Sequence, residues 1–273
     1  MPRWSKPTIP EVQWNDSMSR ALRQYFVVDE EGGAQLKDLA YPPATTVENA
    51  SGWSWTNETG IPAIRGDTTE NYHLSFPNVA YVDQGGGIAA TKMALVRPKV
   101  DTGGQIAYDC FPIVSPSWDL NLSIAHDNWN GWTGTVTTSG GNNSVNQGNL
   151  NLSTADAWTL VIGTYESGTG FTLYVGREMD STITNVGTDN TNSGTILAKT
   201  ARATRFWVQG DQQGAVDFGL FCSMGRHISP AEAQDLFEDP FIAVRPTFYP
   251  IGFVASAPPA GGIEVLRRRR EAA

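Results

Sequence analysis

Alternation of apolar and polar residues marks several short segments of this chain. In residues 118–124, four apolar side chains alternate with Asp, Asn and Ser, and residues 70–76 alternate in a similar way. Residues 92–97 form a short apolar run. Because successive side chains of a β-strand point to opposite faces, a period of two predicts strands with one buried face.

A hairpin is the clearest longer feature of the pattern. Residues 158–165 and 171–176 are rich in β-branched and aromatic residues, and the five residues Glu-Ser-Gly-Thr-Gly at 166–170 separate them. A short Gly-containing connection between two such runs predicts a β-hairpin. Residues 205–209 and 216–224 predict two further strands. Many short strands with frequent turn residues are typical of an antiparallel β-sandwich or jelly roll.

One helix is expected after the last predicted strand. Ser229 can cap it, Pro230 suits the first helical position, and Glu232 completes a capping box. The helix should run through residues 231–237 and end at Asp239, because the residue before a proline avoids the helical conformation.

Polar and proline-rich stretches predict the remaining organisation of the chain. Residues 139–149 and 183–195 are rich in Asn, Gly, Ser and Thr, so we expect them to be long loops. We divide the chain into an N-terminal arm (residues 1–20), one β-sandwich (residues 21–241) and a Pro- and Arg-rich C-terminal extension (residues 242–273).

Composition narrows the partners that such a chain can have. Hydrophobic residues make up 40% of the chain, enough for a core, and the formal net charge of −9 argues against nucleic-acid binding. No apolar run is long enough to span a membrane, and the N-terminal residues lack the apolar region of a secretory signal. We therefore expect synthesis in a host cytoplasm, with a role outside it only after release, as a virion component has.

Three longer segments share their order of motifs with a known family. Residues 155–178 place a Trp-containing strand before a Gly-Thr-Tyr turn and a Leu-Tyr-Val strand, residues 207–241 join a strand to the capped helix, and residues 15–40 precede both. Together they resemble laminin-G-like domains of the concanavalin A-like lectin and glucanase superfamily. The resemblance implies an all-β, antiparallel jelly-roll sandwich with one short C-terminal helix and extended N- and C-terminal arms. The Pro-rich tail is similar to that of bacteriophage structural proteins, although Asp239-Pro240-Phe241 matches their pattern inexactly.

Catalysis and metal binding find little support in the sequence. Glucanases of this superfamily resemble one another in a Glu-x-Asp-x-x-Glu strand that holds two carboxylates about 5 Å apart, and this chain lacks it. Asp127, Asp189 and Asp211 are candidates for a calcium site at the rim, but no ligand-dense motif supports one, so we favour solvated loop acids and expect no cofactor. Cys110 and Cys222 lie in apolar runs, which favours buried thiols and leaves open whether they meet.

Aromatic residues in polar turns leave carbohydrate binding open. His126, Asp127, Trp129 and Trp132 lie in one Asn- and Gly-containing segment, where indole faces could stack on a sugar and polar groups could bond its hydroxyls. The alternative, which we favour, is that these tryptophans return to the core or to a subunit contact. The same choice applies to Trp53 and Trp55.

The two terminal segments contain candidate assembly contacts. Trp4 and Trp14 are unusual in a solvated arm, so they should dock on the domain itself or on a neighbour. A run of four arginines near the C-terminus is either a solvated terminus or an anchor onto an acidic surface. These are Arg267, Arg268, Arg269 and Arg270.

These features together predict a non-enzymatic bacteriophage virion protein. We expect a capsid decoration protein, homo-oligomeric, whose arm and tail attach it to other virion proteins or to neighbouring copies. The alternative is a carbohydrate- or receptor-binding module of a tail or fibre, with a surface glycan as its partner.

Overall fold

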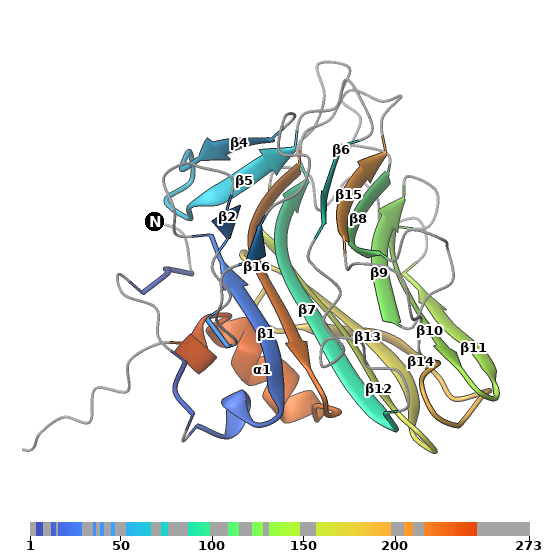
Figure 1. Cartoon of the computed structure of the whole chain (residues 1–273). Coiled ribbons are helices and arrows are strands. Elements are labelled where there is room, and N and C mark those ends of the chain that lie inside the picture. The colour runs from blue at the N-terminus through green and yellow to red at the C-terminus, as the bar shows by residue number, and fades with distance from the viewer. Residues whose placement is uncertain are drawn as a thin grey trace, which may run out of the picture.

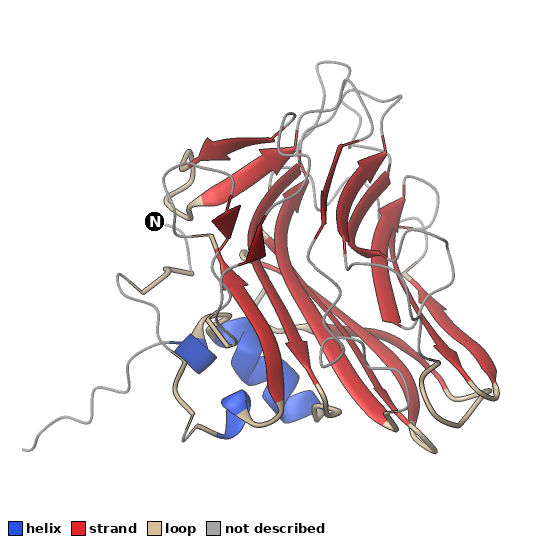
Figure 2. Ribbon diagram, viewed as in Figure 1, coloured by secondary structure: helices blue, strands red, loops and turns tan. Residues whose placement is uncertain are grey.

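The structure is a computed structural model of the whole chain. Within the part of the chain that it describes, strands dominate and the helices are short (Figure 1 and Figure 2). The described residues are 4–7, 12–14, 16–28, 35–36, 39–40, 45–46, 53–66, 72–75, 87–98, 109–114, 122–127, 131–147, 157–197, 205–209 and 216–244.

The larger sheet has eight strands. Their bounds are Leu22–Val27 (β1), Trp53–Thr56 (β4), Ala63–Gly66 (β5), Ala89–Pro98 (β7), Thr159–Glu166 (β12), Gly170–Arg177 (β13), Thr184–Asp189 (β14) and Val216–Met224 (β16). Seven of them follow in the order β14, β13, β12, β7, β16, β5 and β4. β1 pairs with β16 beyond the point where β5 ends, so β5 and β1 share one side of that strand.

The smaller sheet has six strands. Their bounds are Tyr72–Ser75 (β6), Asp109–Val114 (β8), Leu122–Asp127 (β9), Gly131–Thr138 (β10), Gly141–Asn146 (β11) and Arg205–Gln209 (β15). Their order is β11, β10, β9, β8, β15 and β6, and β2 (Gln35–Leu36) and β3 (Thr45–Thr46) form a separate pair. The described strand pairs are antiparallel, which confirms the predicted all-β, antiparallel sandwich.

Two hydrophobic cores lie on the two faces of the eight-stranded sheet. The inner core fills the space between the sheets, and the outer core lies beneath α1 (Pro230–Glu238), η1 (Ser17–Ser19) and η3 (Ile242–Val244). Figure 2 shows these helices gathered at one end of the sheet. β7, β12 and β16 are therefore covered on both faces, which explains why nearly all of their residues are buried, without alternation.

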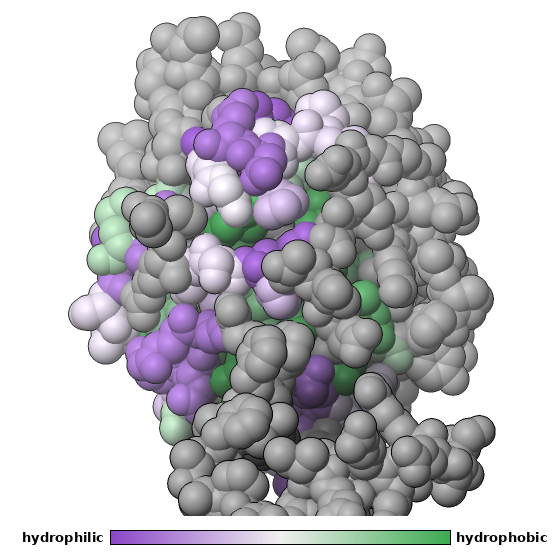
Figure 3. All heavy atoms as spheres, turned by 90° about the vertical axis from the view of Figure 1, so that its left-hand side faces the viewer, coloured by the Kyte–Doolittle hydropathy of each residue, from purple (hydrophilic) through white to green (hydrophobic). Residues whose placement is uncertain are grey.

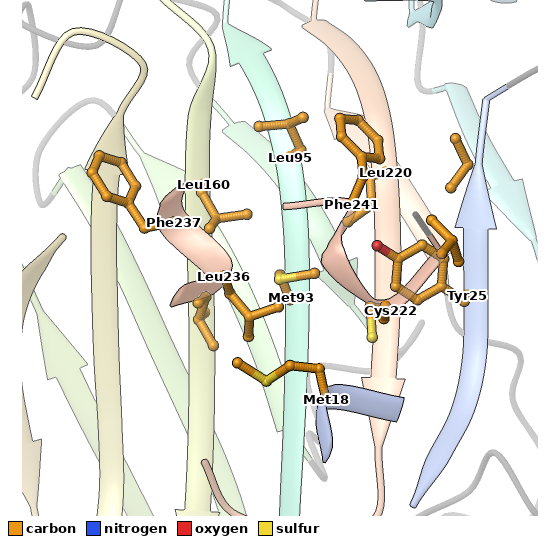
Figure 4. Packing of buried hydrophobic residues seen from close by; sticks show 14 of the residues in the cluster. Met18, Tyr25, Met93, Leu95, Leu160, Leu220, Cys222, Leu236, Phe237 and Phe241 are labelled. Carbon is orange, nitrogen blue, oxygen red and sulfur yellow. The ribbon is translucent and has the colours of Figure 1, made fainter. Parts of the chain in front are cut away.

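The outer core joins segments from both ends of the chain. In Figure 4, Leu236 and Phe237 of α1 lie over Met93 and Leu160 of the sheet, beside Met18 of η1. These apolar side chains, from α1, η1, β7 and β12, are thereby removed from water together, which is the dominant favourable contribution to folding.

The predicted helix and strands are largely confirmed. α1 begins with the expected capping box, in which the Ser229 hydroxyl accepts from the Glu232 N–H at 3.2 Å and Glu232 accepts from the Ser229 N–H at 2.9 Å. Its C-cap is Asp239, as the following proline predicts. The hairpin of β12 and β13 is also confirmed, but its strands extend to the Glu166–Gly170 pair, so its turn has three residues and not five.

Two predictions of long loops are wrong. Much of 139–149 forms the edge strand β11, which pairs with β10 through the two-residue turn Ser139-Gly140. Much of 183–195 forms β14, the edge strand of the larger sheet. Both strands consist mainly of Asn, Thr, Ser and Gly with few apolar residues, a composition that is typical of loops. Backbone pairing along one side is nevertheless sufficient to hold an edge strand.

The N-terminal segment packs on the sandwich. Trp4 is fully buried, and its ring meets that of Phe237 edge to face with centroids 5.6 Å apart. Its indole N–H donates to the Phe237 carbonyl oxygen at 2.7 Å. At the other end, Ala243 and Val244 are fully buried, so packed structure continues past residue 241. Figure 3 shows this side of the molecule, where the described surface is mostly hydrophilic and hydrophobic residues appear between the polar ones.

Candidate binding surface

Trp132 is not available to stack on a sugar. It alternates on β10 with Gly134 and Val136 toward the inner core, and its side chain is fully buried there. The prediction that Trp132 binds carbohydrate is therefore wrong, and the core interpretation that we favoured holds for it. His126 and Asp127 end β9, but their side chains lie outside the described residues, as does Trp129.

The other aromatic candidates include buried and exposed side chains. Trp4 is enclosed by its own domain, so it cannot serve as an assembly contact, whereas Trp14 has 60% of its surface exposed. Trp55 of β4 is partly buried against the inner core, and the side chain of Trp53 lies outside the described residues. The four arginines of the tail (Arg267, Arg268, Arg269 and Arg270) and Asp211 also lie outside them.

Asp217 shows how a buried carboxylate is used in this fold. It is 1% exposed on β16, between Arg65 of β5 and Arg97 of β7. Arg65 Nε donates to Asp217 at 2.7 Å, and Arg65 Nη1 donates to Glu58 at 2.6 Å. These hydrogen bonds, first to Glu58 and then to Asp217, raise the pKa of the Arg65 guanidinium. The guanidinium therefore separates two carboxylates, which is the arrangement of a structural ion-pair network.

Asp189 accepts hydrogen bonds from the backbone of two segments. Its two carboxylate oxygens accept from the N–H groups of Thr191 and Ser144, at 2.9 and 2.8 Å. The Thr191 hydroxyl and these N–H groups lower the pKa of Asp189, which keeps it charged. In the part of the chain that the structure describes, no three His, Cys, Asp or Glu side chains gather as metal ligands would. Cys222 is a buried thiol in the outer core, and the side chain of Cys110 is not described.

The two sheets meet along one edge through a polar seam, formed by Asn143 and Ser144 of β11 with Asp189 and Asn192. Asn143 is fully buried. Its Nδ2 donates to the Asn192 carbonyl oxygen at 2.8 Å, and its Oδ1 accepts from the Asn192 N–H at 2.8 Å. Asn192 Nδ2 in turn donates to the Asn142 carbonyl oxygen at 2.7 Å. The seam fixes where β11 stands relative to β14.

The outer face of the β10–β11 hairpin carries a polar ladder of six uncharged side chains. Thr135 Oγ1 and Ser144 Oγ, in its middle rung, are 3.0 Å apart and hydrogen-bonded. The β10 side chains are half-buried and the β11 side chains are exposed. The ladder consists of the pairs Thr133 and Asn146, Thr135 and Ser144, and Thr137 and Asn142.

Sequence reasoning missed this ladder, although the chain contains a signal for it. Residues 131–138 read Gly-Trp-Thr-Gly-Thr-Val-Thr-Thr, in which threonine recurs at every second position opposite Trp132 and Val136. In residues 142–146 the buried Asn143 and Val145 alternate with exposed polar residues. A period of two in a polar segment indicates a strand as well as it does in an apolar one.

No helix within the described ranges combines the length and the apolar character that crossing a membrane requires.

Comparison with known proteins identifies the fold. No protein-family model matches the chain, and no curated protein matches it significantly. Among solved structures, the binding domain of Paraclostridial Mosquitocidal Protein 1 shares 15% identity with a TM-score of 0.60, over 80% of this chain and 52% of that one. The binding domain of botulinum neurotoxin DC in complex with rat synaptotagmin II shares 12% identity with a TM-score of 0.55, over 80% and 51%.

A third similar structure is the ligand-binding domain of botulinum neurotoxin serotype D in complex with N-acetylneuraminic acid. It shares 10% identity with a TM-score of 0.55, over 80% of this chain and 50% of that one. The chain thus spans about half the length of the structures that it matches. These similarities establish the fold, a β-sandwich.

Proposed function

We propose that this chain is a non-enzymatic recognition module that binds a glycan or a protein receptor. The observation that carries the proposal is the polar ladder, an exposed set of hydroxyl and amide groups with no charge. Such groups both donate and accept hydrogen bonds, so they suit a ligand rich in hydroxyl groups. The fold adds support, because the similar structures are binding domains, one in complex with a protein and one with a sugar acid.

Four carboxylates of the described residues support binding over catalysis. Glycoside hydrolysis in most families needs two carboxyl groups flanking the scissile bond. Here Asp217 and Glu58 are bridged by Arg65, Asp189 accepts backbone N–H groups, and Glu232 caps α1. Each of these acids is engaged in holding the fold.

The test is a binding assay on the purified full chain. We expect saturable binding to members of a glycan array or to candidate receptor proteins, and none by the heat-unfolded chain. Incubation with β-glucans should release no reducing ends. Absence of saturable binding to every glycan and receptor, or release of sugars from β-glucans, would contradict the proposal.

We also propose, as a setting for this function, that the module is displayed on a bacteriophage particle. The exposed Trp14 supports this, because it lies beside Gln13, whose N–H donates to the Ala243 carbonyl oxygen, and is thus held in place for a contact. The arm itself cannot be deleted without removing Trp4 from the outer core. The test is therefore Trp14→Ala, alone and with truncation after Val244: the variants should cosediment less with particles, and equal cosedimentation would exclude these attachment points.

A further inference from the structure

We infer that the polar ladder is the contact surface for a neutral glycan chain. This inference rests on the proposed function and names its site and its ligand class. Along each strand, side chains on one face recur at roughly 7 Å, and neighbouring strands lie about 5 Å apart. The six side chains therefore form a small lattice of hydrogen-bonding groups on the scale of single sugar rings. β10 and β11 end the six-stranded sheet, which leaves this lattice at its margin (Figure 1).

The ladder is rigid before any ligand arrives. Beneath it, Val136 and Val145 are buried in the inner core, and a Cβ added at Gly134 would lie 2.6 Å from the Phe171 ring. The polar seam fixes β11 from its free side. Short side chains such as Thr, Ser and Asn lose less rotamer freedom on binding than long ones, so a fixed lattice of them binds at a low entropic cost.

The charges around the ladder favour an uncharged ligand. None of its six side chains is charged, and the Asp189 carboxylate accepts from the Ser144 N–H of the middle rung. The pKa of Asp189 is lowered by the Thr191 hydroxyl first, so a negative charge stands beside the ladder. A carboxylated sugar would be repelled there, and the formal net charge of −9 acts in the same direction. This chain should therefore differ from the neurotoxin D domain, which is in complex with N-acetylneuraminic acid.

The composition of the ladder also favours a glycan over a protein. Protein interfaces draw most of their affinity from buried Trp, Tyr and Arg anchors. The ladder has none of these, and its members are Thr, Ser and Asn. Hydrogen bonds to many hydroxyl groups are the interaction that such a surface can supply.

The experiment uses the full chain on an array of matched oligosaccharide pairs that differ only in a terminal N-acetylneuraminic acid. The double variant Thr135→Val, Ser144→Ala removes the two central hydroxyls while leaving the Ser144 N–H in place. We expect the unmodified chain to bind neutral members, and the double variant to bind them about tenfold more weakly, the effect of losing two hydrogen bonds. Thr184→Val removes an exposed hydroxyl from β14 and should leave binding unchanged.

The outcomes separate this inference from the function on which it rests. Preference for the sialylated member of each pair would overturn the neutral ligand. Unchanged binding by a double variant that melts at the same temperature as the unmodified chain would overturn the site. Binding to a protein receptor but to no glycan would overturn the inference and leave the recognition module intact. Binding to neither would remove the recognition module itself.

Discussion

Two contact regions, here called joints, connect distant parts of this molecule. One consists of apolar side chains and the other of hydrogen-bonded polar groups. The helix–sheet joint sets α1 and the N-terminal segment on the outer face of the large sheet, with Trp4, Leu236 and Phe237 buried among apolar side chains. The polar seam sets β11 against β14, with Asn143 fully buried and hydrogen-bonded to the backbone of Asn192. Both joints connect distant parts of the chain, and both contain buried side chains. Burial alone therefore does not distinguish them.

The difference between the joints is in what they specify. Apolar contacts are non-directional, so the helix–sheet joint contributes mostly stability in proportion to the area it buries. The amide pair of the seam works only in one geometry, because each donor must meet its acceptor. The seam therefore fixes the position of β11 while contributing only a small net free energy to stability. The polar ladder on β11 is positioned with the strand.

The largest expected effect comes from breaking the helix–sheet joint. Phe237→Ala should lower the free energy of unfolding by about 3–5 kcal/mol, because a buried aromatic ring is lost and its cavity remains. Trp4 also loses its edge-to-face partner. Denaturation in urea, followed by tryptophan fluorescence, measures the change.

The matched control is the neighbouring residue of the same helix. Glu238 is exposed, so Glu238→Ala should change the free energy of unfolding by less than about 0.5 kcal/mol. A Phe237→Ala protein as stable as this control would show that the outer core does not hold α1.

The contrast between the joints also explains what the sequence could predict. The apolar runs of 158–165 and 216–224 and the capping box at Ser229 all indicated their elements, because apolar periodicity and helix caps are local signals. The sequence could not decide whether Trp4 and Trp132 are buried or form a contact surface, since a tryptophan suits either place. Both are buried.

The polar joint was hidden because its stabilising contacts are not local. Asn143 and Asn192 stand 49 positions apart, and nothing near either residue shows that they meet. Asn is also depleted in strands generally, so the residues of β11 and β14 predict loops. The polar ladder was missed for the same reason, although its threonines alternate within residues 131–138.

A smaller effect is expected from breaking the polar seam. Asn143→Ala should lower the free energy of unfolding by about 1–3 kcal/mol, because two hydrogen bonds are lost and the backbone groups of Asn192 lose this partner. Urea denaturation measures the change. Asn142→Ala is the control, since that side chain is exposed and only its carbonyl oxygen serves the seam. Equal stability of the two variants would contradict the role of the amide pair.

The smallest effect concerns the polar rim of the helix–sheet joint, at His227. Burial comes first in lowering its pKa below the ordinary value of 6.5; Glu166 and Glu232 oppose this, and Arg226 adds to it. The unfolded chain then binds more protons at this residue than the folded one. The contribution of His227 to the free energy of unfolding is therefore fully present above about pH 6.5 and declines as the pH falls through that value toward the folded pKa.

His227→Asn should therefore have the same free energy of unfolding in urea as the unmodified chain near pH 8, but lose less of it between about pH 8 and pH 5.5. His73 and His126 are present in both proteins, so the difference between the two pH responses isolates His227. An identical pH dependence of the free energy of unfolding would mean that this imidazole is as exposed to water in the folded chain as in the unfolded one. The contrast between a water-free apolar joint and a polar seam would then be confined to the helix and its aromatic residues.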